Sequence, residues 1–150
     1  MTKHTGESAL SAGQEQPFSI KSIIGPVMAV VVGMIMVILD STVVNVALPN
    51  LIHYFDTTVT TMQWSITAYT LALSAVIPLA GWLTDRFGAK QVFLITIVLF
   101  TLGSVLCSFA QTPEQLIVYR ILQGLGGGMV SPIGMAIIFR LAPPGKQGSI

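Results

Sequence analysis

Charged side chains are scarce in this sequence, since Asp, Glu, Lys and Arg make up only 9% of its 150 residues. A soluble globular domain carries about 25% charged residues, which cover the surface that faces water. Hydrophobic residues make up 53% of the chain, and the mean hydropathy is +0.80. The lipid bilayer is therefore the expected solvent. The net charge is only +1, so no nucleic-acid partner is expected.

Cysteine is almost absent as well. The single cysteine, Cys107, excludes an internal disulfide and a cysteine cluster for zinc or iron–sulfur, and we interpret it as a small hydrophobic core residue. Both histidines, His4 and His53, lie outside the apolar segments, and no Ser/His, Cys/His or metal-ligand cluster occurs in the sequence. We therefore expect no metal site, no cofactor and no enzyme activity.

Four apolar segments recur along the chain, at about 23–48, 62–83, 92–109 and 116–141. Each reaches the roughly 17–25 residues that a helix needs to cross about 30 Å of hydrocarbon. The sequence thus predicts an all-α membrane protein with four spanning helices. Capping boxes are expected at residues 60–63 (TTMQ) and 112–115 (TPEQ), and Gly88 suits a left-handed helix end. Residues 1–20 are expected to form a disordered cytoplasmic tail.

Lysine and arginine are missing from two of the connecting segments, residues 49–61 and 110–115. The basic residues outside the spans lie before the first span, after the second and after the fourth: Lys3, Lys21, Arg86, Lys90, Arg140 and Lys146. The positive-inside rule then places the N-terminus and the second-to-third connection in the cytoplasm.

Two charged residues fall inside apolar segments. A carboxylate at the centre of a span, such as Asp40, costs about 2.5–3.5 kcal/mol on insertion scales. Counting 1.5 Å per residue places Asp40 and Arg120 in the same outer half of the bilayer, so we predict that they face one cavity and sense each other's charge. Ser41 and Asn45 are expected on a polar face beside Asp40. The alternatives are an inert acid that water reaches and an arginine that snorkels to the outer headgroups.

A glycine-rich stretch follows Arg120 in the fourth span. Gly124 and Gly128 form a small-xxx-small pair that allows close helix packing. Together with Gly126 and Pro132 they also weaken the helix locally. Two interpretations stay open, namely tight packing and a bend that changes during the working cycle.

The segment 81–90 (GWLTDRFGAK) is a short, charged connection between the second and third spans. Arg86 and Lys90 are what the positive-inside rule requires. Asp85 is not required by that rule, so we expect it to bond an arginine or a helix N-terminus.

Three motifs of this chain resemble those of the major facilitator superfamily, in the same order. Residues 81–90 (GxLxDRxGxK) are similar to its loop motif between helices two and three. Residues 39–49 (LDSTVVNVALP) resemble the first-helix motif of its drug:proton antiporters, especially the 14-span EmrB/QacA-type branch, and residues 120–126 (RxxQGxG) resemble their fourth-helix motif. The resemblance covers about residues 20–148. Ala89, Gln91 and Gln147 depart from the family pattern.

This resemblance implies a proton-coupled exporter of hydrophobic or cationic drugs that works by alternating access in the cell (inner, cytoplasmic) membrane. The proton gradient would supply the energy without a cofactor. The expected partners are the bilayer, protons, a small lipophilic or cationic substrate, the remaining helices and, in a Gram-negative host, a periplasmic adaptor. The resemblance assigns the proton-coupling cavity to Asp40, Asn45, Arg120 and Gln123. It assigns the cytoplasmic gate to Gly81, Asp85, Arg86, Gly88 and Lys90.

Residues 21–150 are accordingly expected to be the first part of a longer transporter domain, which stops before a fifth span. One alternative is a metabolite symporter or exporter of the same superfamily. Another is a small four-helix exporter that works as a dimer, which leaves the motifs at 81–90 and 120–126 unexplained. A third is a non-transporting four-helix scaffold subunit, which would not need Asp40 and Arg120 together in the apolar zone. Two interpretations of Met34, Met36, Trp64 and Tyr69 stay open: they line a drug pocket, or they face the bilayer.

Overall fold

The computed structural model describes residues 20–141, with side-chain surroundings from 24 to 140. Its helices are α1 (Ile20–Tyr54), α2 (Val59–Phe87), α3 (Ala89–Ser108) and α4 (Pro113–Leu141). All four are long and apolar enough to cross a membrane, and residues 20–141 contain no strand. The prediction of an all-α fold with four spanning helices is confirmed. Apart from Ile20, the predicted tail lies outside the described residues, as does Lys146.

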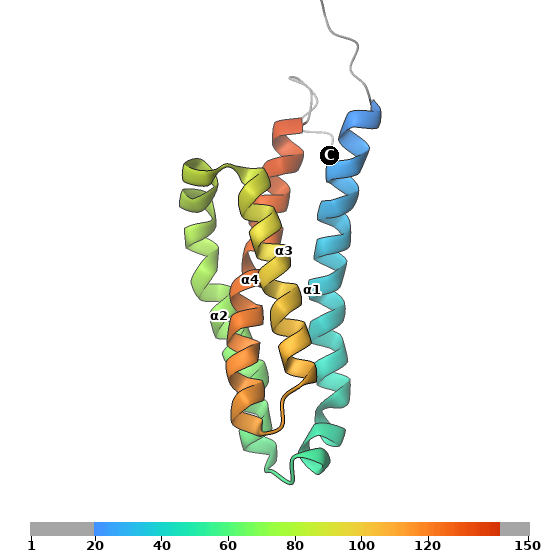
Figure 1. Ribbon diagram of the computed structural model, residues 1–150, viewed down its shortest axis with the longest axis vertical. Helices are drawn as coiled ribbons and strands as arrows, with labels where there is room; N and C mark the ends of the chain where they lie inside the picture. Colours follow the sequence, from blue (N-terminus) through green and yellow to red (C-terminus); the bar gives the residue numbers. More distant parts are fainter. Residues whose placement is uncertain (1–19, 142–150) are drawn as a thin grey trace, which may run out of the picture.

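The helices form one bundle in which consecutive helices run in opposite directions (Figure 1). The α1–α2 and α3–α4 connections lie at one end of the bundle, and the α2–α3 connection lies at the other. α4 packs extensively against α2 and α3 and much less against α1. Half of the apolar window of α4 is buried in the bundle, compared with 17% of that of α1. α1 is therefore the helix that packs least extensively against the rest of the bundle.

Glycines bring α4 close to its two main neighbours. A Cβ atom at Gly124 would lie 2.6 Å from the carbonyl oxygen of Tyr69 in α2, and one at Gly126 would lie 2.6 Å from the amide nitrogen of Phe100 in α3. Contacts that short leave no room for a side chain, so close packing is what the structure shows at this stretch. α4 is a continuous helix through the glycines and Pro132. A bend that changes during the working cycle stays a prediction.

The first helix extends beyond its predicted span. The sequence pattern placed the end of this span at Leu48, before Pro49, but α1 continues to Tyr54. The reason is packing beyond the proline, because Leu51, Ile52 and Phe55 all lie against the buried core around Met62. This contact with the start of α2 outweighs the hydrogen bond that a proline removes from a helix.

The connection between α2 and α3 is shorter than the segment 81–90 suggested. α2 continues to Phe87 and α3 begins at Ala89, so Gly88 alone joins them. Gly88 has a φ of 85° and a ψ of 140°, and its amide donates to the carbonyl oxygen of Thr84. Its positive φ favours glycine, as expected, but its ψ is not that of the left-handed helical cap that the sequence predicted.

The predicted start of the second helix is wrong by two residues. The N-cap of α2 is Thr58, not Thr60, and the Thr58 hydroxyl accepts a hydrogen bond from the amide of Thr61 at 3.2 Å. At α4 the predicted cap is present, since the Thr112 hydroxyl accepts from the amide of Gln115 at 3.3 Å. The Gln115 side chain accepts from the amide of Gln111, one residue before the cap, and not from Thr112 as a capping box requires. Threonine-rich stretches offer several possible caps, and the fold of the preceding turn selects one of them.

Replacing Thr58 by alanine is expected to lower the free energy of unfolding by about 0.5–2 kcal/mol, because the first turn of α2 loses its cap. Thr60→Ala is the matched control and is expected to have almost no effect. Thermal unfolding of the full-length protein in detergent measures both. Equal effects of the two substitutions would contradict the observed cap.

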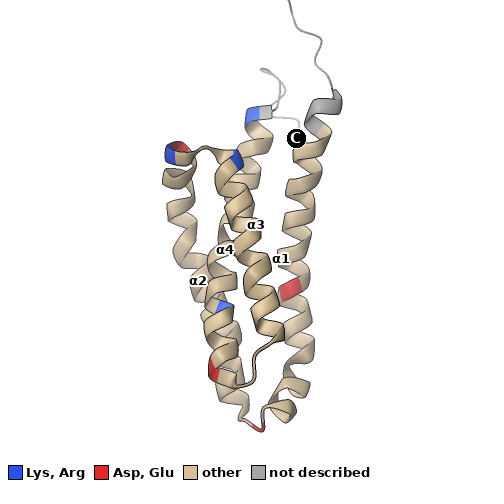
Figure 2. Cartoon of the chain, in the orientation of Figure 1, with Lys and Arg blue, Asp and Glu red and all other residues tan. Residues whose placement is uncertain are grey.

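Lysine and arginine residues gather at one end of the bundle, around the α2–α3 connection and the end of α4, where one acidic residue joins them (Figure 2). These are Arg86, Lys90 and Arg140, whereas the opposite end carries Asp56 in the α1–α2 connection and Glu114 in the first turn of α4. This separation agrees with the predicted orientation, in which the α2–α3 connection faces the cytoplasm.

Candidate functional site

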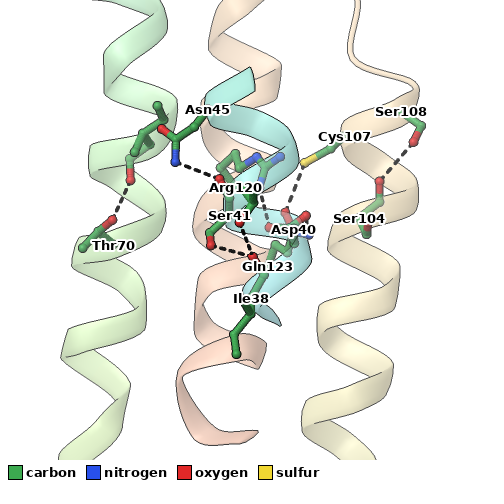
Figure 3. A network of polar contacts seen from close by, with 12 residues as sticks. Ile38, Asp40, Ser41, Asn45, Thr70, Ser104, Cys107, Ser108, Arg120 and Gln123 are labelled. Carbon is green, nitrogen blue, oxygen red and sulfur yellow. Dashed lines mark hydrogen bonds and ion pairs between the residues drawn. The ribbon is translucent and has the colours of Figure 1, made fainter. Parts of the chain in front are cut away.

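An ion pair joins α1 to α4 inside the bundle (Figure 3). Nη1 of Arg120 donates to Oδ2 of Asp40 at 2.8 Å. Nε2 of Gln123 donates to Oδ1 of the same carboxylate, also at 2.8 Å. Arg120 and Gln123 reach Asp40 together because residues three apart lie on one face of a helix. Each carboxylate oxygen therefore has its own donor.

The pair is shielded by the bundle. The Arg120 side chain is 8% exposed and the Asp40 side chain is 14% exposed. Arg120 thus turns inward to a partner and does not snorkel to the headgroups, and Asp40 is not an isolated surface acid. The two residues, which equal depth predicted to face one cavity and sense each other's charge, are in direct contact. A buried charge is tolerated in lipid when it is paired in this way.

Side chains from α2 and α3 complete the surroundings of the pair. The guanidinium carbon of Arg120 lies 5.8 Å from the centroid of the Tyr69 ring. Sγ of Cys107 donates to Oε1 of Gln123 at 3.7 Å. This contact was not predicted, because a lone cysteine in an apolar helix has the same pattern as a core residue. All four helices therefore contribute to the site.

Asn45 does not join the ion pair, although the sequence grouped it with Asp40. Its Nδ2 donates to the carbonyl oxygen of Ser41 at 2.8 Å, within α1. Asn45 and Ser41 instead line a hollow of about 110 Å³ together with Tyr69 and Arg120. Ser41 and Asn45 thus share one polar face of α1, as predicted, and this face meets Arg120 beside the ion pair.

Asp85 has the arginine partner that its sequence context predicted. Oδ1 of Asp85 lies 3.9 Å from an Nη atom of Arg140 at the end of α4. Both side chains are largely exposed, at 82% and 60%. Gly81 and Pro132 line a hollow of about 160 Å³ beside this pair. The contact ties the α2–α3 end of the bundle to the end of α4.

The two basic residues of the predicted gate lie apart from this contact. The Arg86 guanidinium lies over the rings of Trp82 and Phe87, at 5.6 and 5.8 Å from their centroids. Lys90 lies at the rim of a separate apolar hollow of about 410 Å³ between α1, α3 and α4. The gate residues therefore do not form one cluster in this structure.

Of the four residues considered as drug-pocket lining, Tyr69 is buried beneath Arg120 and Met34 packs against the core of the bundle. Trp64 is exposed and lines an open groove of about 530 Å³ between α2 and α4. Met36 is also exposed. The four side chains do not share one pocket.

Residues 30–150 match the sequence pattern of the family described as Major Facilitator Superfamily. The chain belongs to this superfamily. It is therefore a multi-pass protein of the cell (inner) membrane and a member of a family of transporters, not of enzymes. Transporters of this kind draw on ion gradients and generally need no cofactor.

The chain is similar to several proteins named for multidrug resistance. It is 42% identical over 120 residues to the multidrug resistance protein B homolog of Mycobacterium tuberculosis (strain ATCC 25618 / H37Rv), a match that covers 80% of this chain and 22% of the relative. It is 42% identical over 111 residues to the putative multidrug resistance protein MdtD of Yersinia enterocolitica, covering 74% of this chain and 24% of the relative. The MdtD protein of Pectobacterium atrosepticum is 39% identical over the same length, with 24% of that protein covered. The chain thus spans about a quarter of the length of the curated relatives it matches.

Proposed function

We propose that the full-length protein exports hydrophobic or cationic drugs in exchange for protons, and that Asp40 is the residue that binds the proton. The buried contact of Asp40 with Arg120 and Gln123 is the observation that carries this proposal. The names of the relatives support the substrate class. The proton gradient would be the source of energy.

The ion pair gives protonation a mechanical consequence. When Asp40 is charged, its attraction to Arg120 links α1 to α4. Protonation removes the charge of the carboxylate and leaves Arg120 without a counter-charge, so the link weakens. α1 packs less extensively against α4 than α2 and α3 do, and it is the least buried of the four helices. A shift of α1 relative to α4 is therefore the response that the packing favours.

Coupling follows if drug and proton favour different states of the same cavity. Under that condition each ligand shifts the equilibrium between the inward-facing and outward-facing states, and an inward proton gradient drives the drug outward. The site would lie near the middle of the membrane, where transporters of repeated helix units bind their substrates.

The Asp85–Arg140 contact supports a second part of the proposal, a cytoplasmic gate. This pair lies at the basic end of the bundle, and both side chains are accessible to groups from other helices. We propose that Asp85 and its neighbours in 81–90 close the cytoplasmic side together with the rest of the transporter. In a Gram-negative host, a periplasmic adaptor is the partner proposed for the outer side.

Everted membrane vesicles that contain the full-length protein test the direction of coupling. An acid interior is expected to drive accumulation of a fluorescent lipophilic cation such as ethidium, and a protonophore is expected to abolish it. A metabolite symporter of the same superfamily would behave in the opposite way, since an acid interior would drive its substrate out. Accumulation that is independent of the gradient would contradict the proposal.

A further inference from the structure

Two residues of α3, one turn apart, contact Gln123 of α4. They are Gly103, whose backbone lies against the backbone of Gln123, and Cys107, whose thiol bonds the Gln123 amide. We propose that α3 fixes the orientation of the Gln123 amide through this contact, which makes Cys107 a positioning residue for the carboxylate of Asp40. The inference rests on the proposed function, because it concerns how the proposed proton site is set.

The first step is that Gln123 has a fixed place. A Cβ atom at Gly103 would lie 2.7 Å from both Cα and Cβ of Gln123. α3 and α4 can approach this closely only because Gly103 has no side chain. Gln123 is fully buried, at 0% exposure. Its side chain therefore extends between Asp40 and Cys107 and not toward lipid.

The second step concerns the two ends of the amide, which differ in chemistry. The nitrogen end donates to Asp40 at 2.8 Å, and the oxygen end accepts from Cys107 at 3.7 Å (Figure 3). In the reversed orientation the amide oxygen would face a carboxylate oxygen, and both atoms are acceptors. The thiol is a weak donor, but it can bond the amide oxygen only in the orientation in which Gln123 donates to Asp40.

The third step is the effect on proton binding. A donor that bonds the carboxylate favours its charged form over its protonated form. The titratable and charged groups around Asp40 are Arg120 from α4, Tyr69 from α2 and Cys107 from α3. Arg120 bonds the other carboxylate oxygen, so this bond persists when Cys107 is replaced. Loss of the thiol leaves the oxygen end of the amide without its partner on α3, so the amide can tilt and its hydrogen bond to Asp40 weakens.

The test compares two substitutions of Cys107 in the full-length protein by the pH dependence of gradient-driven ethidium accumulation. Cys107→Val has a similar size and no donor, whereas Cys107→Ser keeps a hydroxyl donor. The valine variant is expected to shift the pH of half-maximal rate upward by about half a unit, in line with the loss of one weak hydrogen bond. The serine variant is expected to stay close to the wild-type pH profile.

A second background shows whether Cys107 acts through Gln123. In Gln123→Leu protein, which has no amide to orient, Cys107→Val is expected to add no further shift. Ser108→Ala is the control on the neighbouring residue, since the Ser108 hydroxyl bonds only the carbonyl oxygen of Ser104 within α3, at 3.2 Å.

Three results would overturn the inference. They are equal pH shifts for the valine and serine variants, no shift for the valine variant, and a shift that persists in the Gln123→Leu background. Each of these leaves the proposed function intact as long as wild-type protein shows gradient-driven accumulation. If wild-type protein shows none, the proposed function fails, and the inference fails with it.

Discussion

Replacing Arg120 by alanine is expected to lower the free energy of unfolding by about 3–5 kcal/mol and to abolish gradient-driven efflux. In this variant Asp40 keeps Gln123 as a donor but loses its only counter-charge among the described residues. An unpaired charge inside the bundle is costly, because the surroundings offer little solvation in return. Thermal unfolding of the full-length protein in detergent measures the first effect, and ethidium accumulation in everted vesicles measures the second.

A double-mutant cycle separates the structural from the functional part of this effect. Asp40→Asn removes the charge of the carboxylate while keeping the shape of the side chain. Combined with Arg120→Ala, it leaves no unpaired charge, so the double variant is expected to be more stable than Arg120→Ala alone. A coupling energy of at least about 1 kcal/mol is expected for residues in direct contact. Efflux is expected to stay abolished in the double variant, because it has neither a proton site nor its partner.

Arg140→Ala is the matched control, since it removes an arginine from the same helix. Arg140 lies 3.9 Å from Asp85, and its side chain is 60% exposed. Exposed ion pairs contribute about 0–1 kcal/mol, so its effect on unfolding is expected to be small. Additive single effects at Asp40 and Arg120, or equal losses for Arg120→Ala and Arg140→Ala, would contradict the structural basis of the proposed site.

The spanning helices were predictable from the sequence because lipid imposes a simple requirement on length and polarity. Every helix needs about 20 apolar residues, and every backbone polar group must bond within the helix. The ends of the helices were less predictable. Whether α1 stops before Pro49 depends on whether residues 51–55 find a core to pack against, and that core includes Met62 of the next helix. A pattern within one helix holds no information about such contacts.

The candidate site was likewise predictable only in part. Depth along two helices predicted that Asp40 and Arg120 meet, because depth follows from the rise per residue alone. The rotation of each helix about its axis is set by packing, and contacts that depend on it are harder to predict. Asn45 donates to Ser41 within α1 and shares a hollow with Arg120, and Cys107 is turned toward Gln123. Neither contact follows from residue type, since both depend on how the helices pack against one another.

Replacing Gly128 by alanine is expected to cost about 3 kcal/mol of stability, a value at the upper end for overpacking. A Cβ atom at this position would collide with the carbonyl oxygen of Leu73 and would lie 2.9 Å from its Cα atom. These are backbone atoms of α2, so no change of rotamer relieves the collision. α2 and α4 would have to separate along the most extensive contact in the bundle.

The same substitution at two other glycines gives a graded comparison. At Gly25 nothing lies within 4 Å of the added carbon, so Gly25→Ala is expected to be neutral or to stabilise α1 by up to about 1 kcal/mol. At Gly33 the nearest atom is Cδ1 of Ile97, at 3.0 Å, which is the far end of a flexible side chain. Gly33→Ala is therefore expected to fall between the other two. Thermal unfolding in detergent ranks the three variants, and a Gly128→Ala protein as stable as Gly25→Ala would show that close contact between α2 and α4 does not hold the bundle together.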